Sequence, residues 1–179
     1  MKSEGDEFYL YIGRMSKEKN IMKMLKAYKI SKIKRPLLLA GPDNGILKEV
    51  LGYISNNNLN VKYLGVISED KKRELLRKCR ALINPRPFEA FGITLVEAEA
   101  IGKPTIIVGH GGQEFAAPPD IASLRAEDNE KSIAKAFENM EDESVYYKLS
   151  KGAKKYAENF KMSTILSKYK KFYYKLSQG

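Results

Sequence analysis

Short apolar segments alternate with helical segments along about the first 127 residues, and this alternation constrains the fold more than any other feature. The predicted strands are runs of aliphatic and aromatic residues, at 8–12, 36–40, 61–64, 81–83 and 105–108, with a weaker sixth at 121–124. Strands that are apolar along their whole length and alternate with helices indicate a parallel sheet covered on both faces. We therefore predict a doubly wound α/β fold with a mostly parallel sheet of about six strands.

The segments between these strands place apolar residues at helical spacing and carry recognisable ends. The expected helices are 21–30, one through residues 47–54 with Asp43 as its N-cap, one capped by Ser68, and 95–101, ended by Gly102. After about residue 128 the pattern is helical only. We take 1–179 as a single domain, with its core at about 7–127 and a helical tail at about 128–179.

Length and composition exclude several classes of protein. A chain of 179 residues suffices for one full-sized domain and is too short for two large ones. No run approaches the roughly 18 apolar residues of a membrane helix, and acidic residues precede the first apolar run, unlike in a secretory signal. Cys79 and His110 are the only cysteine and histidine, so we expect no internal disulfide and no Cys/His metal site. A cytoplasmic location is the resulting expectation.

The formal net charge of +10 leaves the class of partner open. A basic surface attracts nucleic acid, an acidic membrane face or a phosphorylated small molecule. The dense patches at 71–73 and 154–155 lie in helical stretches, where a solvated face is the ordinary interpretation. Since no nucleic-acid motif accompanies the charge, we expect no nucleic-acid partner. Peripheral contact with the inner face of a membrane stays open.

The first loop expected at the carboxyl edge of the sheet is basic. In doubly wound sheets ligands bind beyond the carboxyl ends of the strands, on the loops that lead to the helices. Gly13 lets the backbone turn close to a ligand, and Arg14 and Lys19 follow it. A planar guanidinium and a mobile ammonium suit a diphosphate, although a basic surface loop is the ordinary alternative. The sequence contains neither G-x-G-x-x-G nor a P-loop.

The loop after the fourth predicted strand, residues 84–92, carries the most information. Two prolines restrict it, and Glu89 in the loop and Glu97 in the second turn of the next helix should lie near one helix N-terminus. Free amides there suit a phosphate, and the carboxylates can accept hydrogen bonds from sugar hydroxyls. The candidate amides are those of Phe91, Gly92, Ile93 and Thr94. An acid favoured by the helix dipole is the alternative for Glu97 and our interpretation of Glu99.

The loop after the fifth predicted strand, residues 109–114, is rich in glycine. Gly111 and Gly112 can bring the backbone close to a ligand, and His110 can donate a hydrogen bond to it. A flexible turn with a bystander histidine is an equally open interpretation.

Taken together, these segments resemble the C-terminal domain of retaining GT-B glycosyltransferases of family GT4, a Rossmann-like half of that fold. The matching segments lie at residues 11–19, 37–42, 61–68, 84–98, 102–107, 111–112 and 159–163. Two glutamates with seven residues between them, followed by a G-x-P strand, are a fairly specific signal. The resemblance covers nearly the whole chain, and the order and spacing of its parts make it strong.

The resemblance implies a role for each matching residue. Arg14 and Lys19 match the pair that neutralises the donor diphosphate, and Glu89 matches the glutamate that contacts the transferred sugar at the reacting centre. These three would be the catalytic residues. Glu97 matches the residue that binds the ribose hydroxyls, and the amides after Phe91 would hold the distal phosphate. The full donor-binding set would be Gly13, Gly41, Phe91, Gly92, Ile93, Thr94, Glu97, Gly111 and Gly112.

The resemblance also implies the ligands and partners. The substrate would be a UDP-, GDP- or ADP-linked sugar from which a hexosyl group is transferred, and enzymes of this kind usually need no bound metal or other cofactor. A GT-B enzyme also has an N-terminal, acceptor-binding domain of similar size, which is expected here in cis or in trans. Asn20 replaces the usual glycine, and Glu114 comes one residue early, which leaves its role open.

Other function classes are compatible with the same fold. A non-catalytic interaction module could keep the fold, although it has no physical need for Arg14, Lys19, Glu89 and Glu97. A sugar-nucleotide epimerase or a phosphorylase could share the fold too. A phosphorylase would use a pyridoxal-phosphate lysine, and no segment of the sequence suggests one.

Overall fold

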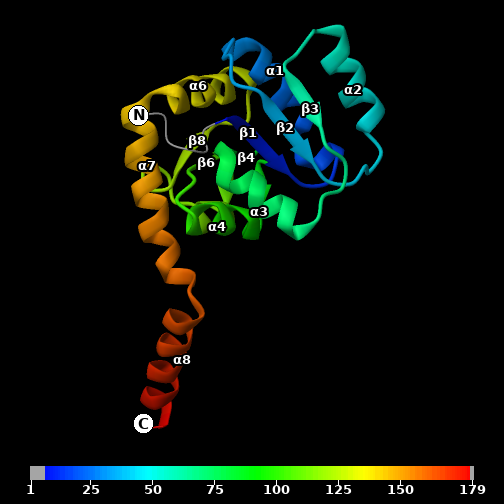
Figure 1. The fold of residues 1–179 in the computed structure, drawn as a ribbon. Coiled ribbons are helices and arrows are strands. Elements are labelled where there is room, and N and C mark those ends of the chain that lie inside the picture. The colour runs from blue at the N-terminus through cyan, green and yellow to red at the C-terminus, as the bar shows by residue number, and fades with distance from the viewer. Residues whose placement is uncertain (1–6, 178–179) are drawn as a thin grey trace.

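The computed structural model describes residues 7–177 and is built on a six-stranded parallel sheet (Figure 1). The strands are β1 (Phe8–Ile12), β2 (Leu37–Ala40), β3 (Val61–Tyr63), β4 (Cys79–Asn84), β6 (Thr105–Val108) and β8 (Ser123–Ala126). Their order is β3-β2-β1-β4-β6-β8, and all neighbouring pairs are parallel. The predicted doubly wound α/β fold with six strands is therefore confirmed.

Strand β1 shows why both faces of the sheet are covered. Tyr9 and Tyr11 belong to one buried cluster, whereas Phe8 and Leu10 belong to another, because successive side chains of a strand point to opposite faces. The first cluster is completed by α1 (Ile21–Ser31), α2 (Leu47–Asn56) and α6 (Glu130–Glu141), and the second by α3 (Glu69–Lys78), α4 (Ile93–Ala100) and α5 (Gly112–Ala116). Figure 1 shows α1 and α6 on one side of the sheet and α3 and α4 on the other.

The chain ends in helices, as predicted. They are α7 (Glu143–Tyr156), the short η2 (Ala157–Phe160) and α8 (Met162–Ser177). Helix α8 runs on beyond α7, away from the sheet (Figure 1), and none of its described residues is buried. Its exposed aromatic side chains and lysines are therefore not part of the core.

Helix α2 differs at its start from the prediction. It begins at Leu47 with Ile46 in the N-cap position, so the assignment of Asp43 as N-cap is wrong. Asp43 nevertheless stabilises this turn, because its Oδ1 accepts hydrogen bonds from the amides of Gly45 at 2.9 Å and Leu47 at 3.1 Å. The predicted cap of α3 is confirmed, since Ser68 Oγ accepts a hydrogen bond from an amide in the first turn.

The last strand and the start of α4 are each shifted by two residues from the prediction, and β4 begins two residues earlier than predicted, at Cys79. The last strand is Ser123–Ala126 rather than 121–124, because Ile121 lies in a turn in which its amide and that of Ala122 donate to the carbonyl of Pro118. Helix α4 begins at Ile93, since Gly92 already provides the N-cap. These shifts leave the predicted loops at the carboxyl edge of the sheet.

Candidate functional site

The candidate site lies where the strand order reverses. The chain runs from β1 to β2 on one side, whereas β4 lies on the other side of β1, and such switch points are where ligands bind in open α/β sheets. The loops that follow β1 and β4 are therefore neighbours. Lys19, in the short helix η1 (Lys17–Lys19), donates a hydrogen bond of 2.9 Å to Glu89 Oε2 across this point. The structure thus brings together two of the predicted catalytic residues.

Glu89 is surrounded by positive charge. Its side chain is 15% exposed, and Oε1 lies 3.5 Å from Arg86 and accepts a 3.1 Å hydrogen bond from the amide of Ala90. Burial alone would raise the pKa of Glu89. The hydrogen bond from Lys19, the charges of Lys19 and Arg86 and the Ala90 amide together outweigh burial, so the pKa lies below its usual range. Glu89 is therefore an anion at neutral pH, suited to accept hydrogen bonds. Arg86 was not singled out from the sequence.

The first loop is held against the second by glycine. The amide of Gly13 donates to the carbonyl of Ala40 at 2.9 Å, and a Cβ on Gly41, whose φ is +134°, would lie 2.1 Å from the Gly13 carbonyl oxygen. Only glycine fits there. These two glycines thus bring the first loop close to the loop after β2, while the approach to a ligand predicted for Gly13 stays a prediction.

Arg14 and Lys19 take different positions in this loop. Arg14 is 57% exposed and lies 3.5 Å from Glu18, four residues later in the chain, whereas Lys19 is mostly buried against Glu89. The structure therefore places Lys19 inside the site and leaves Arg14 at its exposed edge. Asn20 adopts the left-handed backbone expected of a glycine replacement, with a φ of 58°.

Gly111 and Gly112 bring the fifth loop onto the backbone that carries Glu89. The two-residue strands β5 (Phe88–Glu89) and β7 (His110–Gly111) form a separate parallel ladder in which Glu89 pairs with Gly111. A Cβ on Gly112 would lie 1.6 Å from the carbonyl oxygen of Ala90. The backbone that these glycines approach is therefore that of the fourth loop.

Gln113 is the polar residue that ties these loops together, and sequence reasoning missed it. Its side chain is fully buried, and Nε2 donates to the carbonyls of Val108 at 2.6 Å and Arg86 at 3.2 Å. Its Oε1 accepts a 2.9 Å hydrogen bond from Asn84. An isolated glutamine in a loop carries no sequence signal for burial, so only the folded chain shows this role.

Helix α4 presents its N-terminus beside Glu89. Gly92 caps it with a φ of +85°, and the first N–H groups of a helix have no partner within it and carry partial positive charge. Ile93 is exposed and Thr94 is half-buried, while the Phe91 ring packs 5.7 Å from that of Phe160. Phe91 thus anchors the loop through its side chain, and the amides that follow it open the helix.

Glu97, one turn into α4, faces a different cation. Its Oε1 accepts a 2.9 Å hydrogen bond from Lys72 in α3, and the side chain is 35% exposed. The other oxygen, Oε2, is buried and has no donor among the described residues. Lys72 belongs to the basic patch 71–73 that the sequence suggested to be a solvated face, and no local pattern distinguishes it from its neighbours.

The interpretation of Glu99 as an acid favoured by the helix dipole is wrong. Glu99 is next to the last residue of α4, where the dipole disfavours an acid. Its side chain is fully buried, and neither carboxyl oxygen has a hydrogen-bond donor within residues 7–177. Burial raises the pKa of Glu99 to about 8. It is therefore a neutral core residue at neutral pH.

His110 and Glu114, which follow β6, form a polar cluster with Arg125. Glu114 Oε1 accepts a 3.0 Å hydrogen bond from Arg125, and Oε2 lies 3.3 Å from His110 Nδ1 and accepts from the Gly111 amide at 3.3 Å. Glu114, whose role the sequence left open, therefore connects the fifth loop to β8.

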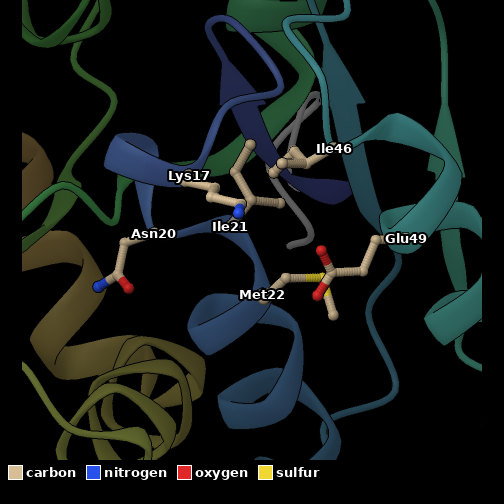
Figure 2. A pocket seen from close by; sticks show the side chains of 6 residues that line it. All are labelled: Lys17, Asn20, Ile21, Met22, Ile46 and Glu49. Carbon is tan, nitrogen blue, oxygen red and sulfur yellow. The ribbon is translucent and has the colours of Figure 1, made fainter.

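A small pocket lies between η1, the start of α1 and the start of α2 (Figure 2). It is lined by Lys17, Asn20, Ile21, Met22, Ile46 and Glu49. Neither Lys19 nor Glu89 contributes to it. This pocket is thus distinct from the site at the switch point.

Comparison with known families identifies the family of the chain. The family described as glycosyl transferases, group 1, matches residues 1–160, which is most of the chain. The chain belongs to this glycosyltransferase family. The predicted resemblance to the C-terminal domain of a GT-B glycosyltransferase is therefore confirmed. The roles of individual site residues stay predictions.

Two curated glycosyltransferases are similar over most of the chain but are longer than it. An uncharacterized glycosyltransferase of Methanocaldococcus jannaschii is 28% identical over 179 residues, which cover 98% of this chain and 50% of the relative. A Campylobacter jejuni enzyme, the N-acetylgalactosamine-N,N'-diacetylbacillosaminyl-diphospho-undecaprenol 4-alpha-N-acetylgalactosaminyltransferase, is 29% identical over 159 residues, 87% of this chain and 43% of the enzyme. The chain spans about half the length of the curated relatives it matches.

Solved glycosyltransferase structures share the fold. Sucrose-phosphate synthase from Thermosynechococcus elongatus has a TM-score of 0.80 at 24% identity, over 97% of this chain and 46% of that protein. The Anabaena protein HepE, in complex with UDP and glucose, has a TM-score of 0.79 at 19% identity, over 98% of this chain and 49% of HepE. No helix within the described residues 7–177 is both long and apolar enough to cross a membrane.

Proposed function

We propose that the chain is the donor-binding domain of a retaining, GT4-type glycosyltransferase that transfers a hexosyl group from a nucleoside-diphosphate sugar. The observation that carries this proposal is the 2.9 Å contact between Lys19 and Glu89 at the switch point of the sheet. A cation for a diphosphate and an anion for sugar hydroxyls are thus adjacent, next to the N-terminus of α4. The solved relatives in complex with UDP and a sugar support the choice of ligand class.

The charges of the site match the charge that develops during transfer. When the bond between sugar and diphosphate breaks, negative charge grows on the leaving phosphate, and fixed donors stabilise it. Lys19 and the first amides of α4 would supply these donors, and Arg14 at the exposed edge would add its guanidinium to the same group. Lys19 then exchanges Glu89 for the phosphate, while Arg86 keeps a positive charge beside Glu89.

Glu89 and Glu97 would hold different parts of the donor. Glu89, an anion in the loop before α4, would accept hydrogen bonds from the transferred sugar at the reacting centre. Glu97, one turn into the helix, would accept hydrogen bonds from the ribose hydroxyls. Backbone at Gly13, Gly41, Gly111 and Gly112 would line the rest of the donor site.

The proposal needs no resident metal and no cofactor besides the donor substrate. Lys19, Arg14 and the helix N-terminus supply positive charge in the place where a divalent cation would act in a metal-dependent transferase. An acceptor-binding GT-B domain, in cis or in trans, would supply the acceptor and close over the donor. We further propose a cytoplasmic location with peripheral contact to a membrane, which the exposed lysines and aromatic residues of α8 support.

Isothermal titration of the chain with UDP, GDP, ADP and their glucose- or mannose-linked forms tests the proposal. We expect one nucleotide family to bind with a Kd of about 1 mM or below, equivalent to roughly −4 kcal/mol or better. The variant Lys29→Met, whose lysine contacts only Asn57 among the described residues, should bind as the wild type does. Absence of binding by all these ligands at millimolar concentration would overturn the proposal.

A further inference from the structure

Lys72 differs from its neighbours on α3 in where its charge is placed. Its side chain is 14% exposed, whereas those of Lys71 and Arg73 are 48% and 64% exposed. Lys72 Nζ lies 2.8 Å from Glu69 Oε2 on its own helix and 2.9 Å from Glu97 Oε1 on α4. It therefore connects the surface of α3 to the carboxylate beside the proposed donor site.

Glu97 is held by this contact through one of its two oxygens. Oε2 is buried without a donor among residues 7–177, whereas Oε1 accepts the hydrogen bond from Lys72. Burial acts to lower the pKa of Lys72, but its hydrogen bonds to Glu69 and Glu97 outweigh this effect and raise the pKa. Lys72 is thus a cation near neutral pH, and its hydrogen bond to Glu97 is charge-assisted.

The contact also leaves Glu97 able to bind a ligand. A carboxylate oxygen has two lone pairs, so Oε1 can accept a second hydrogen bond while it keeps the one from Lys72. With Oε1 held from the α3 side, the side chain keeps one orientation at the start of α4. A donor hydroxyl then meets an acceptor that is already oriented.

We infer that Lys72 is a positioning residue for nucleotide binding, which acts by holding the Glu97 side chain in one orientation toward the ribose hydroxyls. This inference rests on the proposed function of the site. The exposed Glu69 serves only to complete the hydrogen bonding of Lys72, so its removal should leave ribose recognition intact.

The first test compares Lys72→Met with the matched control Lys71→Met, whose lysine pairs with Glu74 on the outer face of α3. With the nucleoside diphosphate that binds best, we expect Lys72→Met to weaken binding about tenfold and Lys71→Met to change it less than about twofold. Lys72→Arg, which keeps the charge, should recover binding to within about threefold. Equal losses in the two methionine variants would overturn the inference.

The second test changes the ligand instead of the protein. It uses nucleotides that lack one of the ribose hydroxyls. The wild type should bind the 2′-deoxy or the 3′-deoxy form of that nucleotide about tenfold more weakly, whereas Lys72→Met should lose less than about twofold on the same change. Glu69→Gln should show the wild-type loss. If Lys72→Met is folded by circular dichroism and its affinity still falls about tenfold when a ribose hydroxyl is removed from the nucleotide, the inference alone is contradicted. If the wild type binds no nucleotide, the proposed function is contradicted.

If Lys72→Met does not fold, Lys72→Gln replaces it in both tests. The glutamine side chain stays polar, but it lacks the positive charge and reaches less far. The same loss of coupling to the ribose hydroxyls is expected from this variant, and retained coupling would overturn the inference.

Discussion

Glu89 and Glu97 lie on the two sides of one helix N-terminus, yet different parts of the chain neutralise them. Glu89 meets Lys19 from the loop after β1 and Arg86 from its own loop. Glu97 meets Lys72 from α3, and one of its oxygens lacks a donor within the described residues. The first glutamate therefore joins two loops across the switch point, whereas the second joins two helices on one face of the sheet.

This difference shows that the cations opposite a carboxylate, rather than its place in the sequence, decide what it can do. Glu89, with two cations and an amide, has a pKa below its usual range. Glu99, on the same helix as Glu97, has no donor within the described part of the chain, and its pKa is raised to about 8. The three glutamates thus differ in how many donors face the carboxylate, from Glu89 with the most to Glu99 with none among the described residues. The following variants test this comparison.

The largest effect is expected for Glu99, the glutamate without a donor in the described part of the chain, and it concerns stability. The pKa of Glu99 is raised from 4.5 to about 8 on folding, so the unfolded chain loses this proton first and the native state becomes less stable as the pH rises between these values. We expect the stability of Glu99→Gln relative to the wild type to increase by about 3 kcal/mol between pH 5 and pH 8. Urea unfolding of both proteins at both pH values measures this change. If the difference in the free energy of unfolding between variant and wild type did not depend on pH, Glu99 would already be ionised in the native state.

The next largest effect is expected on ligand binding when Lys19, the cation that contacts Glu89, is replaced. Lys19→Met should weaken nucleoside diphosphate binding by about 100-fold, because a charge-assisted contact of roughly 2 to 3 kcal/mol is lost. Lys17→Met is the control, since Lys17 lies in the same short helix but lines the neighbouring pocket. Titration calorimetry at one salt concentration separates the two. Similar losses in both variants would mean that only the general positive charge of the loop matters.

The smallest effect compares the two glutamates directly. Glu97→Gln should weaken binding of the nucleoside diphosphate and of the nucleotide sugar alike, by about tenfold, because both ligands carry the ribose. Glu89→Gln should weaken only the nucleotide sugar, by a similar factor, and leave the diphosphate within about twofold. Competition titrations with both ligands measure this pattern. If the two variants behave alike, the separate roles proposed for Glu89 and Glu97 are wrong.

Much of the fold could be predicted because its signals are local. Apolar runs such as Phe8–Ile12 and Thr105–Val108 mark buried strands wherever they occur, and Ser68 caps the helix that directly follows it. The prediction failed where a distant or irregular contact decides the geometry. The side chain of Asp43 bonds to Leu47 across an irregular turn, and Ile121 is held in a turn instead of a strand.

The sequence by itself determined the class of fold, the loops that carry the candidate site and the family to which the chain belongs, because each depends on residue types and on the order of segments along the chain. Only the tertiary structure decided which charges face one another. Lys19 meets Glu89 across 70 positions of the sequence, and Lys72 meets Glu97 between two helices, because the strand order β3-β2-β1-β4-β6-β8 sets the neighbours. The burial of Glu99 and Gln113 follows from packing in the same way, and no local pattern carries it.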